Sequence, residues 1–533
     1  MTGNNEQIAV EAKDGGREMK RDRKNIVILG LLLTAVLCLT VIVYLLWNRA
    51  AYINGLSGAE NAQEDGAGKE RMSISIGMWD IGQKLARDEV LSAIEDKFDI
   101  ILKPVNVNYT NWTQEYQKMA ASDSLPDIIV HDIIGSATYS AWLAQGIIRP
   151  LPSKLKDYPN LEAYMDSEYI QNFKESDGGI YFVPRMTYPE ESLWALDRCI
   201  VVRKDWLEEL KLELPQNDEE FREVLKAFTN SDFDGDGEKN TIGLATENMN
   251  TLEAIYLSVF PELSNIERGW MQEEGRWMPV YASKRTGEAL AYTKELYDSG
   301  LLDRQFPYRT IPEAFSLFTE GKSGALCCQY FNLVKYWDET DPDHMSLDKI
   351  AVIKPWPAED GNRYSFTSSL HWSELYFSSG VSDAKMDRIL KLFDYLLSEE
   401  AKDLFYHDGD TEWLNQNPSI EVFSTLVSWN QQEFYEKSPS AVGIYGEENL
   451  DYAIELMDWY RNNTTTVHYN NKITFLSTPS KLLLPTYQEI KDDMIQTIMG
   501  KKDAKKAWEE VLEKYRSETP LEAAIKEVTA LTD

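Results

Sequence analysis

The sequence has few of the residues from which most enzymes build a reactive centre. Five histidines are scattered along the chain and form no HExxH pattern and no triad-like context. Four cysteines include no C-x-x-C pair, so neither a zinc site nor a dithiol redox motif is indicated, and we expect buried free thiols. No P-loop and no GxGxxG segment is present. The 88 acidic residues could still supply a pair of hydrolytic carboxylates, but no signature selects one.

Basic residues are also scarce relative to acidic ones. The 533 residues include 54 lysines and arginines against 88 aspartates and glutamates, a formal net charge of −34. A field of this sign repels phosphate backbones, so we expect no nucleic-acid partner. Hydrophobic residues make up 43% of the chain, which is typical of a folded protein, and the length predicts two or more packed units.

Long apolar runs are missing except near the N-terminus. Residues Ile26 to Trp47 carry no charge over 22 positions, enough to cross a hydrocarbon layer of about 30 Å. The basic residues before this run are Lys20, Arg21, Arg23 and Lys24. The positive-inside rule therefore leaves the N-terminus in the cytoplasm and sends the rest outward.

We interpret this segment as an uncleaved anchor, with a cleaved signal peptide as the alternative. Signal peptides usually have a shorter apolar core of about 7–15 residues. Leu37 precedes Cys38, where a lipoprotein signal would place a small residue, so lipidation is not indicated. We expect a cytoplasmic tail over 1–24, a transmembrane anchor over 25–47, and a linker over 48–72 rich in Gly, Ala and polar residues. The bulk of the chain is then the extracellular part of a single-pass protein of the cell membrane.

Strand and helix patterns alternate beyond the linker. Apolar residues at every second position predict a strand over Ser73 to Trp79. The short apolar run Ile128 to Val130 predicts a buried strand that ends at His131-Asp132. Apolar residues at i, i+3, i+4 and i+7 predict a helix over Phe221 to Phe228. This alternation predicts an α/β architecture, with two lobes rather than a solenoid.

The run "SDFDGDGEKNT", from Ser231 to Thr241, concentrates acidic side chains around two glycines. Counted from Asp232, side-chain oxygens fall at positions 1, 3, 5 and 9, on Asp232, Asp234, Asp236 and Asn240. Glu238 occupies position 7, where a backbone carbonyl serves, and Gly237 takes the sharp turn at position 6. This order predicts an EF-hand-type loop that binds a structural Ca²⁺, with a solvated acidic turn as the alternative. Position 12 is Gly243 instead of the bidentate Glu, so the Thr241 hydroxyl or a distant carboxylate would complete the shell.

Segments around this loop carry a family resemblance. "VVRKDWLEELKLELP", "FREVLKAF" and "DFDGDGEKNTIGL" run in this order from Val201 to Leu244. Further matches are "GGIYFVPR", "TEGKSGAL", "LFDYLLSEEAKDLFYHDGDTEW" and "IMGKKDAKKAWEEVLEKY". From about Ser73 to the C-terminal helix, the chain resembles the extracellular solute-binding proteins of family 1, in the LplA-like or alginate-binding-like branch that serves carbohydrate ABC transporters.

The resemblance implies a two-lobed periplasmic-binding-protein-like fold of type II, with hinge strands and a ligand between the lobes. It implies an N-terminal lobe of residues 73–193 plus 328–371 and a C-terminal lobe of 194–327 plus 372–533. Crossovers would fall near Leu193–Val201, Leu326–Tyr330 and Trp372–Phe377. It also implies calcium on the loop and ABC permease subunits as partners. Most relatives are lipoproteins, from which this chain departs.

Carbohydrate sites use aromatic faces against sugar rings and carboxylates, amides or arginines against hydroxyls. The chain offers 15 Trp and 28 Tyr. Candidate ligand-binding residues at predicted strand ends or lobe junctions are Trp79, Asp132, Arg185, Tyr188, Trp194, Trp270, Trp372, Glu374 and Trp413. Core packing is the alternative for each. Two glycosylation-acceptor matches, Asn108-Tyr109-Thr110 and Asn111-Trp112-Thr113, are interpreted as chance.

The functional hypothesis is a membrane-tethered substrate-binding protein that delivers a carbohydrate, of oligosaccharide size, to an ABC importer by lobe closure. The chain is not predicted to be an enzyme and no catalytic residue is assigned. The alternatives are a carbohydrate-active hydrolase and a ligand sensor with the same fold.

Chelation tests the calcium prediction. A structural ion cancels the repulsion between the loop carboxylates, so adding EDTA is expected to lower the melting temperature of the protein. An unchanged melting temperature would remove the structural role of the ion.

Overall fold

A computed structural model describes residues 71–532, except for 110, 189–190, 234, 236, 267, 342–346, 407–410, 429–445 and 468–469. The chain divides into two compact units, 1–70 and 71–533. The predicted tail and anchor, and nearly all of the predicted linker, lie outside the described residues. Among the helices that are described, none is long and apolar enough to span a membrane.

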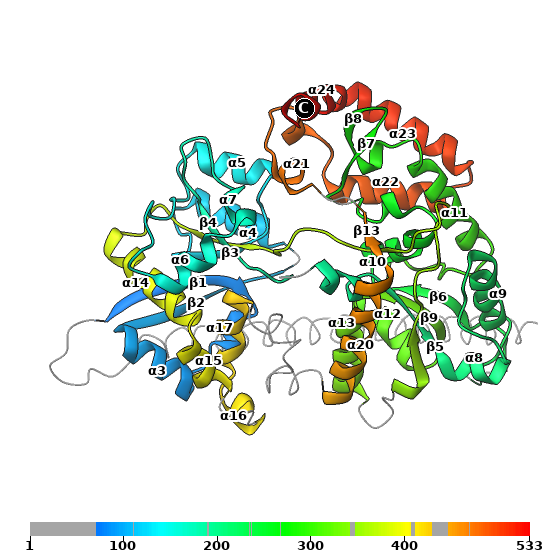
Figure 1. Ribbon diagram of the computed structural model, residues 1–533, viewed down its shortest axis with the longest axis horizontal. Coiled ribbons are helices and arrows are strands. Elements are labelled where there is room, and N and C mark those ends of the chain that lie inside the picture. The colour runs from blue at the N-terminus through cyan, green and yellow to red at the C-terminus, as the bar shows by residue number, and fades with distance from the viewer. Residues whose placement is uncertain are drawn as a thin grey trace, which may run out of the picture. The chain divides into compact units, whose positions relative to one another are not determined.

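The first of two main sheets has five strands in the order β2-β1-β3-β12-β4. They are β1 (Met72–Trp79), β2 (Ile100–Val107), β3 (Ile128–His131), β4 (Phe182–Pro184) and β12 (Glu374–Phe377). β1 pairs in parallel with β2 and β3, whereas β12 runs antiparallel to β3 and β4. The strands predicted at Ser73 to Trp79 and Ile128 to Val130 are confirmed. We call this sheet and the helices packed on it the N-lobe (Figure 1).

Helices cover both faces of the N-lobe sheet. They are α2 (Ile81–Lys84), α3 (Glu89–Phe98), α4 (Trp112–Ala121), α5 (Ala137–Ala144), α6 (Pro159–Met165), α7 (Glu168–Gln171), α14 (Asp383–Leu396), α15 (Glu399–Tyr406), α16 (Thr411–Gln416) and α17 (Ser419–Val427). One buried cluster joins β1 and β3 to α3, α6, α14, α15 and α17, and another joins the opposite face to α4 and α5. Local sequence explains where α3 begins and which side of it is buried. The Asp88 carboxylate accepts the Leu91 N–H and caps the helix, and the apolar residues of the helix face the sheet.

The second main sheet has four strands in the order β10-β5-β9-β6. They are β5 (Cys199–Arg203), β6 (Ile242–Thr246), β9 (Ser323–Cys328) and β10 (Ile350–Val352). β5 runs antiparallel to β9 and β10, and β6 is parallel to β9. Cys199, Cys327 and Cys328 are buried free thiols in this sheet, as expected. We call this sheet and the elements packed on it the C-lobe.

Many short elements surround the C-lobe sheet. The α-helices among its described residues are α8 (Lys204–Leu210), α9 (Asp218–Thr229), α10 (Met249–Leu252), α11 (Thr286–Asp298), α12 (Ile311–Thr319), α13 (Tyr330–Thr340), α20 (Glu447–Asn463), α21 (Asn471–Phe475), α22 (Tyr487–Met499), α23 (Ala504–Glu518) and α24 (Leu521–Thr532). The 3-10 turns are η1 (Glu191–Leu196), η2 (Glu253–Ser258), η3 (Pro261–Leu263), η4 (Val280–Ala282), η5 (Leu347–Lys349) and η7 (Lys481–Leu483). Two-stranded pairs are β7 (Trp270–Glu273) with β8 (Arg276–Pro279), and β11 (Tyr364–Ser365) with β13 (Thr465–Thr466).

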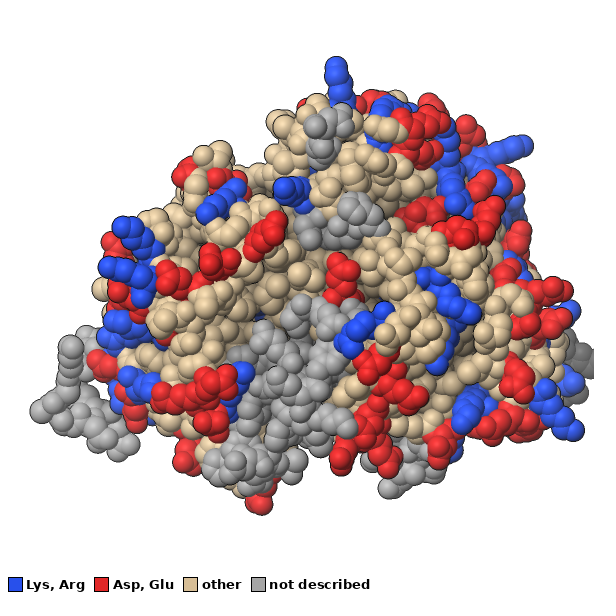
Figure 2. All heavy atoms as spheres, in the orientation of Figure 1, with Lys and Arg blue, Asp and Glu red and all other residues tan. Residues whose placement is uncertain are grey.

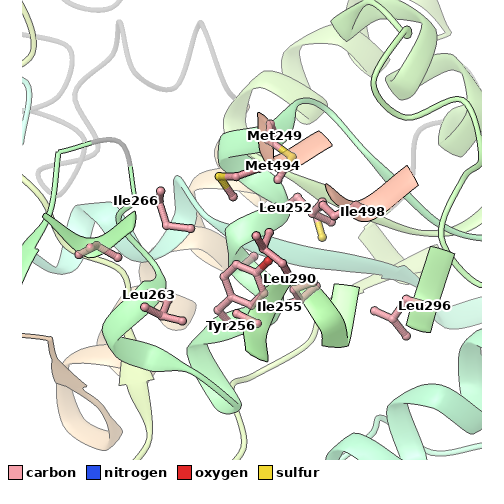
Figure 3. Packing of buried hydrophobic residues seen from close by; sticks show 14 of the residues in the cluster. Met249, Leu252, Ile255, Tyr256, Leu263, Ile266, Leu290, Leu296, Met494 and Ile498 are labelled. Atoms are coloured by element: carbon pink, nitrogen blue, oxygen red, sulfur yellow. The ribbon is translucent and has the colours of Figure 1, made fainter. Parts of the chain in front are cut away.

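The C-lobe core is continuous from the sheet to the C-terminal helices. The predicted helix over Phe221 to Phe228 is confirmed as part of α9, and its four apolar residues are buried. Figure 3 shows Met249, Leu252 and Tyr256 of α10 and η2 near Met494 and Ile498 of α22, and all five are fully or almost fully buried. This packing makes α22 to α24 part of the lobe.

Two segments pack differently from the predicted lobe boundaries. Strand β12 and helices α14 to α17 belong to the N-lobe, because β12 lies inside its sheet and the helices contribute to its core. Helix α13 and strand β10 belong to the C-lobe, because β10 pairs with β5 and α13 packs in the same core. The crossover predicted at Leu326–Tyr330 is therefore wrong. The sheet to which a strand adds depends on contacts far away in the sequence, which local patterns do not encode.

One glycine shows how tightly the C-lobe sheet and α9 fit. A Cβ on Gly324 of β9 would lie 2.1 Å from the Phe228 ring, which is fully buried. We expect Gly324→Ala to lower the free energy of unfolding by roughly 1–3 kcal/mol or more, measured by denaturant titration.

The matched control is Gly82→Ala. A Cβ on Gly82 of α2 would meet only Asn106 Oδ1, at 3.9 Å. This substitution is expected to leave stability unchanged or slightly raised. Equal effects of the two substitutions would contradict the packing account of Gly324.

Candidate functional site

A cleft of about 800 Å³ lies between the lobes and is lined by residues from both of them. Its N-lobe wall is aromatic. Trp79 ends β1, Tyr109 and Trp112 follow β2, and Trp372 precedes β12. The ring centroids of Trp79 and Trp372 are 5.3 Å apart, as are those of Tyr109 and Trp112. The four side chains therefore form one continuous aromatic wall.

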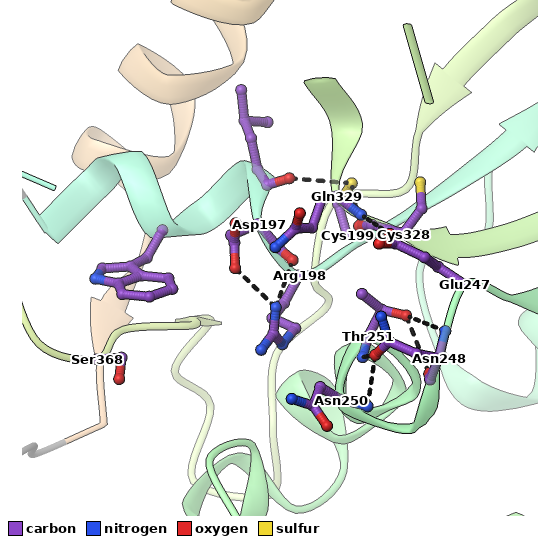
Figure 4. A network of polar contacts seen from close by, with 12 residues as sticks. Asp197, Arg198, Cys199, Glu247, Asn248, Asn250, Thr251, Cys328, Gln329 and Ser368 are labelled. Carbon is purple, nitrogen blue, oxygen red and sulfur yellow. Dashed lines mark hydrogen bonds and ion pairs between the residues drawn. The ribbon is translucent and has the colours of Figure 1, made fainter. Parts of the chain in front are cut away.

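The C-lobe wall is polar (Figure 4). The Arg198 guanidinium donates to Asp197 Oδ2 over 2.7 Å, and the Gln329 backbone N–H donates to Glu247 Oε2 over 2.8 Å. Asn248 caps α10 by accepting the N–H groups of the following residues. Asp197 and Arg198 directly precede β5, Glu247 directly follows β6 and Gln329 directly follows β9, so the sheet positions them. The wall offers carboxylates, amides and a guanidinium.

Burial changes the acidity of two carboxyls in this wall, those of Asp197 and Glu247. Glu247 is 3% exposed, and desolvation raises its pKa to about 7. Loss of solvent also raises the pKa of Asp197, although Arg198 partly opposes this shift. Glu247 is therefore a group that changes charge near neutral pH.

A stacked aromatic pair lies where the chain passes from the N-lobe to the C-lobe. The rings of Tyr188 and Trp194 are 3.5 Å apart and almost parallel, at 14°. The Trp194 indole N–H donates to the Ser369 carbonyl over 3.0 Å, and the Tyr188 hydroxyl donates to Asp197. Both rings line the cleft. They connect its two walls at the crossing segments.

Contacts between the lobes include an ion pair and an aromatic cluster. Arg268 of the C-lobe forms an ion pair with Asp132, which follows β3 of the N-lobe. Phe475 of α21 packs edge-on against Phe173 and lies 5.3 Å from the His371 ring. The ion pair lines the cleft, so its side chains are also within reach of a ligand.

Of the nine predicted ligand-binding residues, six line the cleft and three do not. The six are Trp79, Asp132, Arg185, Tyr188, Trp194 and Trp372. Trp270 is buried in the C-lobe core beneath the Lys481 ammonium group. Glu374 is fully buried, and Trp413 packs on the N-lobe core. The alternative interpretation, core packing, describes these three residues.

Sequence reasoning missed several residues of the cleft. Tyr109 and Trp112 lie in the two segments interpreted as chance glycosylation matches, although both follow the carboxyl end of β2. The rule that selected Asp132, a position just after a strand, would have found them. Arg198, Glu247 and Arg268 also line the cleft. No local pattern distinguishes these three from other charged residues.

The acidic loop is described only in part, because Asp234 and Asp236 lie outside the described residues. Gly235 and Gly237 have φ of 71° and 88°, which only glycine adopts without strain, and the Gly237 N–H donates to Asp232 over 3.1 Å. The Thr241 hydroxyl donates to the Ser231 carbonyl over 2.7 Å. That bond ties the two ends of the loop together.

The described part of the loop includes several of the predicted ligands. The Asp232 carboxylate accepts the Gly237 N–H, and Glu238 and Asn240 are exposed. Within the described portion of the chain, no group of three or more His, Cys, Asp or Glu residues could hold a metal. The metal ligands therefore remain a prediction.

The raised pKa of Glu247 predicts a pH-dependent stability. The ordinary value of the carboxyl is 4.5, so between about pH 4.5 and 7 the folded state holds more protons than the unfolded one. The free energy of unfolding should therefore fall as the pH rises through this window, by at most about 3 kcal/mol, and level off above it.

Glu247→Gln removes this titration. The free energy of unfolding of the variant minus that of the natural chain, from denaturant titrations, is expected to increase from about pH 5 to pH 8. A constant difference would show that the Glu247 carboxyl titrates normally.

No protein-family model matches the sequence. The polygalacturonan/rhamnogalacturonan-binding protein YtcQ of Bacillus subtilis strain 168 is 30% identical over 296 residues, 54% of this chain and 56% of YtcQ. Lipoprotein LipO of the same strain is 23% identical over 472 residues, 86% of this chain and 91% of LipO. The fructooligosaccharide ABC transporter substrate-binding protein FusA of Streptococcus pneumoniae serotype 4 is 26% identical over 213 residues, 38% of this chain and 40% of FusA. The matched regions thus span about half the length of YtcQ and less of FusA.

Solved structures share the fold. The alginate-binding protein AlgQ2 without calcium ion has a TM-score of 0.64 at 16% identity, over 87% of this chain and 99% of AlgQ2. S. pneumoniae FusA in complex with kestose has a TM-score of 0.61 at 15% identity, over 87% and 99%. An EF-hand mutant of FusA in complex with fructo-nystose has a TM-score of 0.59 at 14% identity, with the same coverage. The chain thus has the mixed α/β fold of the sugar-binding proteins of ABC transporters, and its relatives YtcQ and FusA are named as binding proteins.

Proposed function

We propose that the chain is an extracytoplasmic substrate-binding protein that captures an oligosaccharide between its lobes for an ABC importer. The observation that carries the proposal is the cleft, in which an aromatic wall on the N-lobe faces a polar wall on the C-lobe. Sugars combine C–H faces that pack on aromatic rings with hydroxyls that need hydrogen-bond partners. The volume of about 800 Å³ is large enough for several sugar rings.

A two-lobed arrangement of type II would give this proposal its mechanism. The chain crosses between the sheets from β4 to β5 and from β10 to β12, and these crossings would serve as hinges. A ligand that contacts both walls stabilises the closed arrangement, and permease subunits could read that arrangement. The Arg268–Asp132 ion pair already connects the walls and would favour closure.

Relatives support the class of ligand and of partner. YtcQ is named for binding polygalacturonan and rhamnogalacturonan, AlgQ2 for alginate and FusA for fructooligosaccharides in ABC transport. All three names point to sugar oligomers. We therefore propose a carbohydrate ligand and ABC permease partners for this chain.

We also propose that residues 25–47 anchor the protein in the cell membrane with the described part outside. The uncharged run from Ile26 to Trp47 and the basic residues before it support this orientation. An anchored binding protein stays near its permease, which raises the effective concentration of one for the other.

Calcium on the acidic loop is part of the proposal. Asp232, Asp234, Asp236, the Glu238 carbonyl and Asn240 would hold the ion. The glycine turn and the bond from Gly237 to Asp232 support such a loop. Phe233 stacks on Trp206 at 4.1 Å, so an ion that orders the loop would also fix this contact with the C-lobe core.

A hydrolase is the second candidate, because Glu247 has the raised pKa of a general acid and shares its wall with Asp197. Incubation of the full chain with oligosaccharides, followed by chromatography, distinguishes the two functions. Release of shorter sugars would contradict a pure binding role.

Binding itself is tested by thermal shift and calorimetry with neutral and acidic oligosaccharides. Trp372→Ala opens a gap in the aromatic wall and is expected to weaken binding roughly tenfold or more. The matched control is Trp413→Ala, which removes an indole outside the cleft and should lower stability without changing affinity. Failure of every oligosaccharide to bind the natural chain would end the proposal.

A further inference from the structure

Arg185 lies at the bottom of the cleft in an unusual state. It follows β4, is 5% exposed and lines the cleft. Its Nε donates to the Thr425 carbonyl over 2.7 Å, and its Nη1 donates to the Ser373 hydroxyl. Both acceptors are neutral. A guanidinium is thus buried in the cleft without a hydrogen-bonded carboxylate among the described residues.

The other two guanidinium groups of the cleft differ in this respect. Arg198 is paired with Asp197, and Arg268 is paired with Asp132. Asp132 is therefore already engaged by another arginine. Arg185 alone among these three has no ion pair within the described part of the chain.

Glu374, the other carboxylate that acts on Arg185, is also engaged. It accepts the Ile133 N–H and the Tyr376 hydroxyl, and it faces His371 Nε2 over 3.0 Å. It is fully buried and does not line the cleft. It attracts Arg185 through the protein interior but leaves the cleft side of the guanidinium open.

The open side of Arg185 faces the ligand space. Its Nη2 atom donates no hydrogen bond to any described residue. The atom is also not fully buried, because it is absent from the set of buried polar atoms without a partner. It therefore keeps access to the cleft. The guanidinium carbon lies 5.5 Å from the Trp79 ring centroid and 5.3 Å from that of Trp372. The free donors are thus held beside two indole faces of the aromatic wall.

Burial without an anionic partner costs free energy. Desolvation lowers the pKa of Arg185 to about 10, so the group stays charged at neutral pH. The indoles and the carbonyl at the end of α17 offset only part of this cost. A planar carboxylate would accept two parallel hydrogen bonds from the outer nitrogens and supply the missing charge.

We propose that the ligand of this cleft is an acidic oligosaccharide, whose uronate carboxylate binds Arg185 while its ring stacks on the aromatic wall. This inference rests on the proposed function and specifies its ligand class. The names of the relatives leave that class open, because FusA is named for fructooligosaccharides and YtcQ for polygalacturonan.

The charge of the remaining cleft makes this recognition local. The lining includes six carboxylates and three guanidinium groups, and the whole chain carries a net charge of −34. Acidic and basic side chains are interspersed over the described part of the face drawn in Figure 2. Selectivity must therefore come from the contact with Arg185 rather than from long-range steering.

The experiment compares ligands that differ only in charge. Trisaccharides of galacturonate, mannuronate and glucuronate are titrated into the full chain by calorimetry, each beside its methyl ester and beside neutral kestose. At least one free acid is expected to bind roughly tenfold or more tightly than its ester.

Variants assign that preference to Arg185. Arg185→Met is expected to weaken binding of the acid to the level of the ester and to leave ester binding unchanged. Arg185→Lys keeps the charge and should retain part of the preference, which keeps the test valid if the Met variant fails to fold. The control is Arg149→Met, which removes a half-buried arginine that bonds Val381 and Asp383 outside the cleft. It should keep the full preference.

Each other outcome is decisive. Equal binding of acid and ester, or binding of kestose alone, overturns the acidic ligand but leaves the binding protein intact. An acid preference that survives both Arg185 substitutions overturns the role of Arg185. Absence of binding by every sugar contradicts the proposed function itself.

Discussion

The arrangement of the cleft depends on one buried carboxylate. Glu374 is fully buried at the start of β12, so every lone pair needs a partner. Its bonds to the Ile133 N–H, the Tyr376 hydroxyl and the His371 ring fix the end of β3 and the turn that enters β12. That turn includes Trp372, which is thereby placed in the aromatic wall. Glu374 does not line the cleft, yet it positions residues that do.

The two walls differ because they come from different sheets. The N-lobe strands end in aromatic residues and in Arg185, whereas the C-lobe strands end in carboxylates and amides. A sugar bound between them would meet apolar faces on one side and hydrogen-bonding groups on the other. The buried guanidinium groups on the two sides differ in their partners. Arg198 carries its own counter-ion, while Arg185 is held by neutral oxygens and indoles.

Local patterns in the sequence predicted local structure and part of the site. The strand of β1 and the apolar stripe of α9 were predictable because alternation and helical spacing report burial directly. Trp79, Asp132 and Trp372 were found because strand ends converge at one edge of a sheet. Trp270 and Trp413 fill cores, and nothing in the sequence around a tryptophan separates these uses. The lobe boundaries failed for a different reason, since pairing of β12 with β3 and β4 is decided by contacts across the whole chain.

The position of β12 inside the first sheet also constrains how the molecule forms. The contact between Ile133 and Glu374 joins residues 241 positions apart, with the C-lobe sheet strands between them in the chain. The N-lobe therefore has a high contact order, and its sheet cannot be completed until most of the chain is present. Until then β3 and β4 expose unpaired edges, which are prone to association with other chains. The C-lobe strands β5, β6, β9 and β10 are contiguous in comparison, so the second sheet can pair before the first one is complete. The helices α22 to α24, which complete the C-lobe core, are the last elements of the chain, so neither lobe is finished until its end is present.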